Sequence, residues 1–210
     1  MRLPVRGLVE GLIGHPMRRA VLRARITRPY WQYRFHSFGT ETIVLRPGSI
    51  FGAQQIAIGS YSIVFGGSYL SVETPAWDKP GPVLSIGDRV GVGPYSMISA
   101  SESIVIEDDV IMGALCGVID SDHTFAQGRP NVMHNSVASE PVRIGRGTWL
   151  AERVAVLKGS TIGRCCIVGT NSVVRGDLPD YSIAAGSPAR IVGEVSGVDA
   201  DAPAFRNRVW

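Results

Sequence analysis

The chain has 210 residues, of which 45% are hydrophobic and 19% charged, and its formal net charge is +3. This length and composition predict one soluble globular domain with a sizeable apolar core. No stretch approaches the roughly 20 consecutive apolar residues that a membrane span needs, and no uninterrupted apolar segment precedes a small-residue cleavage site near the N-terminus, so we expect a cytoplasmic protein without a secretory signal.

A basic arm or cap is predicted over residues 1–48. Residues 1–34 carry eight Arg against the single Glu10, a balance of +7, which leaves −4 for the rest of the chain. The apolar residues on both sides of Pro16 have a spacing compatible with short amphipathic helices. The favoured interpretation is a helical cap over the open end of the domain; the alternative is peripheral contact with an anionic membrane, at the inner face of the cytoplasmic membrane. No nucleic-acid motif is found in the arm, so no nucleic-acid partner is expected.

Six-residue units follow the arm, fourteen in number, and most of them open on Ile or Val. The clearest run steps by six from Ile144 to Val174, and shorter runs begin at Ile58 and Ile86, with a slip of two residues before Ile106. The residue four places after the opening residue tests this register independently. It is Ser, Thr, Val or Cys in eleven units: Ser62, Ser68, Val90, Ser96, Val110, Cys116, Thr148, Val154, Ser160, Cys166 and Ser172.

A period of six fits neither a helix nor an exposed strand, and it is typical of a parallel β-helix. We therefore predict an all-β fold, a left-handed parallel β-helix in which three hexads close a triangular coil of 18 residues. The hexad pattern indicates the left hand, against the usual crossover rule. The opening aliphatic residue and the small residue four places later should both point inward. Gly follows the opening residue in seven units, and we expect it to allow a positive φ at the corner.

The predicted β-helix covers residues 49–193 and is followed by a mobile tail at 194–210. A loop at 123–141 interrupts it. A long loop in a compact domain is usually functional or disordered, so this loop is the predicted location of the site.

Three cysteines are present. Cys116 and Cys166 occupy inward small-residue positions, which predicts reduced packing residues and agrees with a cytoplasmic compartment. Cys165 points outward in the same register.

His123 is the candidate catalytic side chain, and it lies in the sequence IDSDHTF where the regular coil ends and the loop begins. A neutral imidazole is well matched to removing a proton near pH 7. Asp120 or Asp122 could fix its tautomer and stabilise the imidazolium, and Asp122 is the preferred partner. On these residues alone, the alternative is a solvated surface histidine.

Three stretches give this chain its family resemblance: DSDHTF at 120–125, PVRIGRGTWLAERVAVLKGSTIG at 141–163 and VGTNSVVRGDLPDYSIAAGSPARIVGE at 168–194. With the upstream hexads, they cover roughly two thirds of the chain. They resemble the hexapeptide-repeat acetyltransferases, specifically the sugar O-acetyltransferases of the maltose, galactoside and exopolysaccharide type. The last stretch is the most specific, because its residue order is not required by a β-helix.

The resemblance implies a homotrimer with three sites, each in a cleft between neighbouring prisms. Acetyl-coenzyme A (acetyl-CoA) would be the donor, no metal is expected, and the acceptor would be the hydroxyl of a small or lipid-linked sugar in polysaccharide or glycolipid biosynthesis. His123 resembles the catalytic base, with Asp122 and Asp120 beside it, and His134 and Asn131 would contact the acceptor. The residues that the resemblance assigns to coenzyme A are Trp149, Ala151, Gly169, Thr170, Arg175 and Arg190.

Two departures from the family pattern bear on the acceptor. Related exopolysaccharide enzymes often carry D-H-D-H where this chain has Asp120 to His123, so only one His remains to act as the base. An Asn that galactoside-type members place near the acceptor has no clear match at 93–96, which argues against a simple galactoside or maltose acceptor.

Three other functions stay open on the same fold. One is N-acetyl transfer to a nucleotide-linked amino sugar, and another is a binding or scaffold protein without catalysis. A zinc-dependent carbonic anhydrase needs three His ligands, but only His123 and His134 lie in the repeat region.

Overall fold

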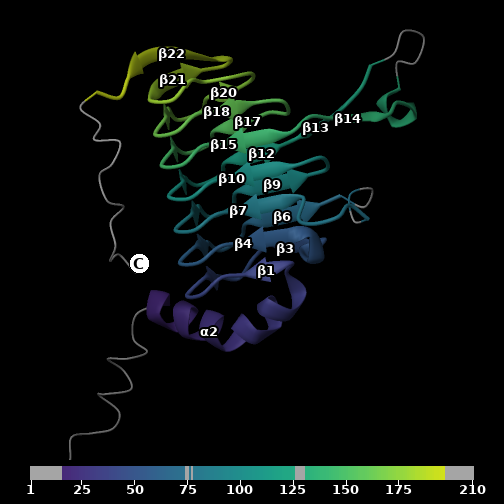
Figure 1. Cartoon of the computed structure of the whole chain (residues 1–210), viewed down its shortest axis with the longest axis vertical. Helices are drawn as coiled ribbons and strands as arrows, with labels where there is room; N and C mark the ends of the chain where they lie inside the picture. Colours follow the sequence, from purple (N-terminus) through teal and green to yellow (C-terminus); the bar gives the residue numbers. More distant parts are fainter. Residues whose placement is uncertain (1–15, 74–75, 77, 126–130, 197–210) are drawn as a thin grey trace, which may run out of the picture.

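The protein is a left-handed parallel β-helix with one helix at its N-terminal end (Figure 1). A computed structural model describes residues 16–73, 76, 78–125 and 131–196. Residues 1–15 of the predicted arm and 197–210 of the predicted tail lie outside the described residues. The predicted fold class is confirmed.

Three parallel sheets form the faces of the prism, and each coil contributes one short strand to each face. Sheet A contains β1 (Ser37–Phe38), β4 (Ile56–Ile58), β7 (Leu84–Ile86), β10 (Ile104–Ile106), β15 (Val142–Ile144) and β18 (Thr161–Ile162). Sheet B contains β2 (Ile43–Val44), β5 (Ile63–Val64), β8 (Gly91–Val92), β11 (Ile111–Met112), β16 (Trp149–Leu150), β19 (Ile167–Val168), β21 (Ser182–Gly186) and β22 (Ala189–Glu194). Sheet C contains β3 (Ser49–Phe51), β6 (Tyr69–Val72), β9 (Met97–Ala100), β12 (Gly117–Ile119), β17 (Ala155–Val156) and β20 (Val173–Val174).

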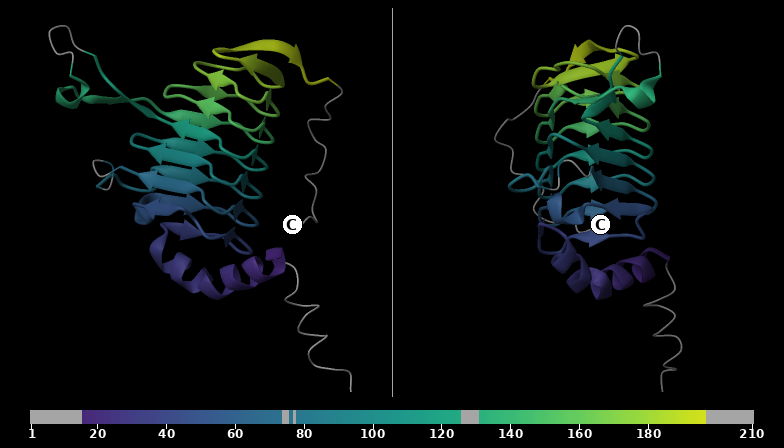
Figure 2. Two further views of the ribbon diagram at one scale, coloured as in Figure 1. Left: turned by 180° about the vertical axis from the view of Figure 1, so that it is seen from behind. Right: turned by 90° about the vertical axis from the view of Figure 1, so that its right-hand side faces the viewer.

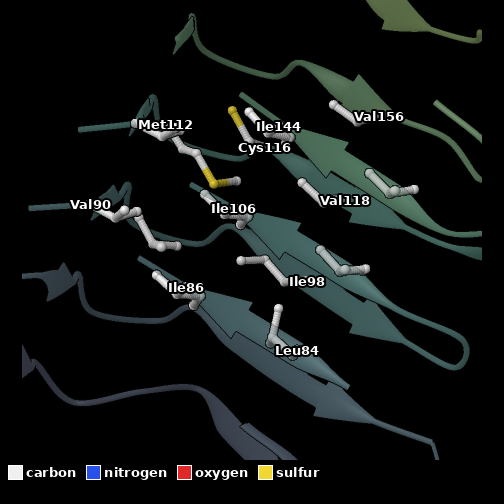
Figure 3. Close-up of a cluster of buried hydrophobic side chains, with 14 of the residues drawn as sticks. Leu84, Ile86, Val90, Ile98, Ile106, Met112, Cys116, Val118, Ile144 and Val156 are labelled. Carbon is white, nitrogen blue, oxygen red and sulfur yellow. The ribbon is translucent and has the colours of Figure 1, made fainter. Parts of the chain in front are cut away.

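The core is a stack of aliphatic side chains that point inward from all three sheets (Figure 3). In sheet A, Ile58, Ile86, Ile106, Ile144 and Ile162 pair in register from coil to coil. Each is at most 3% exposed, so removal of their apolar surface from water stabilises every coil against its neighbours. The eleven residues predicted to fill the smaller inward positions are all buried, which confirms the register of the hexads.

The glycines after the opening residues serve another purpose than the one predicted from the sequence. Gly93 does not have a positive φ; instead, a Cβ there would lie 2.2 Å from the carbonyl oxygen of Gly113 in the next coil. The positive φ falls two places later, for example at Tyr95 (57°) and Arg89 (56°), whose side chains point outward. The expectation of a positive φ at these glycines was therefore wrong, and close stacking of successive corners explains them.

The two ends of the prism are closed differently. Helix α2 (Pro16–Arg34) lies across the N-terminal end, next to the first coil, and none of the helices in the described part of the chain is long and apolar enough to cross a membrane (Figures 1 and 2). The first coil begins at Ser37, inside the segment assigned to the arm from the sequence. At the other end, β22 folds back antiparallel on β21 and covers the last coil.

Candidate functional site

The long loop forms an arm that leaves the edge between sheets C and A. Its two strands, β13 (Ser121–His123) and β14 (Val137–Ser139), pair antiparallel, and Figure 2 shows them projecting from the side of the prism. His123 is exposed and lies opposite Val137. Phe125 and Met133 are also largely exposed on this arm, so a single chain leaves apolar side chains of the arm uncovered.

Asp120 holds the root of this arm. Its carboxylate is fully buried and accepts hydrogen bonds from the backbone N–H groups of Ser101 (2.7 Å), Glu102 (2.8 Å) and Ser103 (2.9 Å). Three N–H donors would be costly to bury without acceptors. Both carboxylate oxygens of Asp120 are therefore used by a neighbouring turn, not directed at His123.

The same turn explains the slip of two residues in the hexad pattern. Ile106 pairs with Ile86, 20 residues earlier, whereas Ile162 pairs with Ile144, 18 residues earlier. The additional residues lie in the turn at 101–103, whose N–H groups bind Asp120. The irregularity that interrupts the repeat is thus coupled to the base of the arm.

Asp122 lies next to His123 on β13, and successive side chains of a strand point to opposite faces. It is exposed, and among the described residues no hydrogen bond joins a carboxylate to the imidazole of His123. Ser121, two residues before His123, lies on the same face of the ribbon as the imidazole.

Ser121 belongs to a polar column that sequence reasoning missed. Its Oγ lies 3.3 Å from that of Ser101, while Ser71 and Ser99 on the outer face of sheet C both donate to Oε1 of Glu73, at 3.0 and 3.2 Å. Ser71 and Ser99 stand on two successive coils below the arm, and Ser121 is on the arm itself. They could be found from the sequence only with the register in hand, because Ser71 and Ser99 are 28 residues apart.

A second group of predicted residues gathers on sheet B and on the edge between sheets B and C. The indole of Trp149 is 47% exposed on the outer face of β16, and Ala151 follows at the corner. One coil further, Gly169 lies close enough to Ala185 that a Cβ on it would be 3.3 Å from the Cβ of Ala185. Ala185 pairs with the exposed Arg190 in β22.

Thr170 is exposed at this same edge, directly after Gly169. An exposed aromatic ring and a cation on sheet B therefore lie beside a strip of small residues at its edge with sheet C. This set fits an extended ligand with a narrow chain and a phosphate group.

Arg175 does not join that group. It is exposed and follows β20, at the edge between sheets C and A where the arm also leaves the prism. In a triangular prism, this edge is opposite sheet B. The structure therefore separates His123 and Arg175 from Trp149, and one chain presents two halves of a site on different sides.

The predicted acceptor contacts lie on a short 3₁₀ turn, η3 (Val132–His134), within the arm. Asn131 precedes this turn, and its Oδ1 accepts a hydrogen bond from the backbone N–H of Met133 at 3.0 Å. Asn131 thus caps a local turn, and His134 is exposed on it.

The cysteines behave as the register predicts. Cys116 and Cys166 are buried, and burial raises the pKa of both thiols, whereas Cys165 is partly exposed. Within the described ranges, no group of three or more His, Cys, Asp or Glu side chains is placed to hold a metal ion.

Comparison with known proteins gives several relatives, although no family model matches the chain. The chain is 42% identical over 109 residues to a probable acetyltransferase of Mycobacterium tuberculosis, and this alignment spans 52% of the chain and only 36% of that relative. It is 35% identical over 139 residues to WbbJ, a putative lipopolysaccharide biosynthesis O-acetyl transferase of Escherichia coli, and this covers 62% of the chain and 71% of WbbJ. Galactoside O-acetyltransferase of Escherichia coli is 27% identical over 136 residues, which covers 62% of the chain and 66% of the relative.

Solved structures share the fold. AntD, an N-acyltransferase from Bacillus cereus crystallised as a mutant with dTDP and coenzyme A, superposes with a TM-score of 0.67 at 20% identity, covering 80% of this chain and 88% of AntD. A hexapeptide-repeat acetyltransferase from Vibrio cholerae, complexed with acetyl-CoA, superposes with a TM-score of 0.54 at 16% identity and covers 93% of both chains.

Proposed function

Because this chain belongs to the family of hexapeptide-repeat acetyltransferases, we propose that it transfers the acetyl group of acetyl-CoA to a hydroxyl group of a sugar. The observation that carries the proposal is the pair of half-sites. His123 stands exposed on the arm at one edge, and Trp149 with its strip of small residues stands on the opposite sheet.

The two half-sites support a homotrimer in which each site is made by two subunits. The arm of one subunit would lie against the edge between sheets B and C of its neighbour. That contact would cover Phe125 and Met133, which are exposed in the single chain. Burial of such side chains favours association.

His123 is proposed as the general base. Its imidazole takes the proton of the acceptor hydroxyl while the oxygen attacks the thioester carbonyl, and the imidazolium then returns the proton to the departing coenzyme A sulfur. A backbone N–H near the donor would stabilise the oxyanion. General base catalysis is worth about 10² to 10⁴ in rate, and holding donor and acceptor in one cleft supplies much of the rest.

The polar column below the arm suits a hydroxyl-rich acceptor. Ser71, Ser99 and Glu73 form a connected set on the outer face of sheet C, and Ser101 and Ser121 continue it to the arm. Hydroxyl and carboxylate groups can both accept hydrogen bonds from sugar hydroxyls. WbbJ, whose name places it in lipopolysaccharide biosynthesis, supports an acceptor from polysaccharide or glycolipid synthesis.

A second candidate function is N-acetyl transfer to a nucleotide-linked amino sugar. The fold similarity to AntD, an N-acyltransferase crystallised with dTDP, favours this alternative. The two products differ chemically: an acetyl ester is cleaved by mild base and an acetamide is not.

The test is an acceptor screen with acetyl-CoA, read as a gain of one acetyl group in the acceptor mass and repeated after mild base treatment. Loss of the added mass in base supports O-acetylation, and retention supports N-acetylation. His123→Ala should lower turnover by at least about 10² while the trimer persists. His36→Ala, at an exposed histidine between α2 and the first coil, should stay within about twofold, since it touches neither half-site.

Near-normal turnover in His123→Ala would identify another base. Failure of the wild-type protein to consume acetyl-CoA with any acceptor, although it binds coenzyme A, would favour a non-catalytic scaffold.

A further inference from the structure

Helix α2 has two apolar faces, and only one of them is used by the fold. The inner face carries Ala24, Arg28 and Trp31, and Phe35 follows directly after the helix; these residues recur every three or four positions and so lie on one side. Phe35 is buried and stacks on Phe38 of the first coil, with ring centroids 5.4 Å apart.

One apolar contact and one hydrogen bond attach the rest of this inner face to the prism. Ala24 packs with Leu45 and Ile63 in a small buried cluster. Arg28 donates a hydrogen bond from Nη2 to the carbonyl oxygen of Gly39 at 3.1 Å. The inner face of α2 thus packs against the first coils of the prism.

The outer face carries a second apolar stripe. Leu22, Ile26, Tyr30 and Tyr33 are spaced by four, four and three residues, so they also share one side of the helix. At about 100° per residue, this stripe is opposite the inner face. The four side chains are between 52% and 89% exposed, and in Figure 2 none of the elements of the described residues covers the side of α2 that faces away from the prism.

Positive charge flanks the outer stripe. The helix contains six Arg and no acidic residue. Arg23 and Arg34 are exposed on one flank, and the guanidinium of Arg34 stacks over the ring of Tyr30, 5.7 Å from its centroid. On the other flank, Arg25 forms an ion pair with Glu41 at 3.3 Å, which ties this side of the helix to the first coil.

We propose that the outer face of α2 is a docking surface for an anionic lipid bilayer. A helix with an aliphatic and aromatic stripe between basic side chains lies in the plane of the interface, with the stripe in the headgroup boundary and the cations at the lipid phosphates. Tyr is suited to this position, because its ring is apolar and its hydroxyl stays hydrated. The uniform charge of the helix favours a uniformly anionic surface.

Flotation of the full chain with lipid vesicles tests this proposal in the absence of any substrate, so its outcome is independent of the proposed acetyl transfer. The vesicles contain phosphatidylcholine alone, or with about a quarter phosphatidylglycerol. The protein should float with the anionic vesicles and not with the neutral ones. Raising the salt from about 0.1 M to about 0.5 M should weaken binding, because ions screen the Arg side chains.

Two sets of variants separate the stripe from the charges. The double variant Ile26→Ser with Tyr33→Ser should lower vesicle partitioning at least about tenfold. Arg23→Gln with Arg34→Gln should weaken the preference for anionic vesicles, because two of the six Arg of the helix are then neutral. All four positions are exposed, so the thermal melting curve should stay close to that of the wild type. Val192→Ser, 67% exposed at the other end of the prism, is the matched control and should float like the wild type.

Three results would overturn the proposal. Equal flotation with neutral vesicles, or none with anionic ones, would exclude an anionic lipid partner. Unchanged flotation of the serine variant would place the binding elsewhere in the chain. A concentration-dependent association of the wild type that needs no lipid, and that the serine variant loses, would show that a second copy covers the stripe.

Discussion

The carboxylate of Asp120 lies 2.7 Å from the backbone nitrogen of Ser101, and this contact ties the arm that carries His123 to the preceding coil. The backbone continues the connection, because the carbonyl oxygen of Asp120 accepts a hydrogen bond from the N–H of Glu140 at the end of the arm. Asp120 therefore fixes both ends of the arm. It is a positioning residue, three places away from the proposed base.

Replacing Asp120 by Asn tests this role. The carboxamide would direct its NH₂ group at a backbone donor, so we expect a loss of about 2–3 kcal/mol in unfolding free energy. Because the arm would then be less ordered, turnover should fall. The pH at which turnover is half-maximal should not move. Asp122→Asn, at an exposed position, should leave stability within about 0.5 kcal/mol.

The opposite pattern would contradict the positioning role. A shift of the pH profile in Asp120→Asn without a loss of stability would show that this carboxylate acts directly on the imidazole.

The fold could be predicted from the sequence because one period runs through most of the chain. Ile144 and its successors repeat every six residues, and both the stacked strands and the small inward residues follow from that spacing. The role of Asp120 could not be predicted, because it depends on N–H groups that are exposed by a turn about 18 residues earlier. The same holds for Glu73 and Ser99, which meet only across two coils.

The glycines at the corners show a further limit of sequence reasoning. A glycine next to a corner suggests a positive φ, but Gly93 is needed because Gly113 stacks on it. A contact between residues 20 positions apart is not visible in the local pattern. A pair of alanine substitutions therefore distinguishes the two explanations.

Gly93→Ala should destabilise the protein by at least about 2 kcal/mol, because its Cβ would overlap the backbone of the next coil and force the stack apart. Gly91→Ala is the matched control, since a Cβ there meets nothing within 4 Å. It should be neutral or stabilising by up to about 1 kcal/mol, because alanine has less conformational freedom in the unfolded chain. Thermal unfolding of both variants measures the difference. Equal stability of the two would show that the coils can separate without cost.

Glu73→Gln tests the polar column below the arm. The carboxylate accepts hydrogen bonds from Ser71 and Ser99, and the proposed acceptor would meet the same surface. We expect the KM for the acceptor to rise about tenfold, which corresponds to about 1.4 kcal/mol, with the affinity for coenzyme A unchanged. Glu102→Gln, at an exposed site paired with Lys79, is the control. An unchanged acceptor KM in Glu73→Gln would remove the column from the site.

Trp149→Ala tests the donor half-site. The indole should pack on the donor, so its loss should weaken coenzyme A binding at least about tenfold by calorimetry. Ile111 is its partner in register on the coil below and is equally exposed, at 47%, so Ile111→Ala controls for the loss of apolar surface. We expect less than a twofold effect in this control. Dissociation of the proposed trimer in Trp149→Ala, with coenzyme A affinity retained, would instead make the indole a contact between subunits.

The ion pair between Asp109 and Arg89 should make the stability of the fold vary with pH in the acid range. Burial of Asp109 opposes its ionisation. Its carboxylate also lies 2.5 Å from Nε of Arg89 and 3.1 Å from Nε of Arg146. The hydrogen bonds and charge interactions with these two guanidinium groups outweigh burial, so the pKa of Asp109 is lowered. A carboxyl group whose pKa is lower in the folded chain stabilises the fold above its ordinary value of about 3.8. That contribution is lost as the pH falls through the folded pKa.

Asp109→Asn should therefore lower the unfolding free energy by about 1–2 kcal/mol at neutral pH. The difference from the wild type should stay constant down to about pH 5 and then shrink toward zero as the wild-type carboxyl group becomes protonated. Denaturant unfolding at a series of pH values measures this. Asp78→Asn, at an exposed position, should follow the wild type throughout. A difference that persists at the acid end of the series would mean that Asp109 stabilises this corner through its shape and its uncharged hydrogen bonds, independent of its charge.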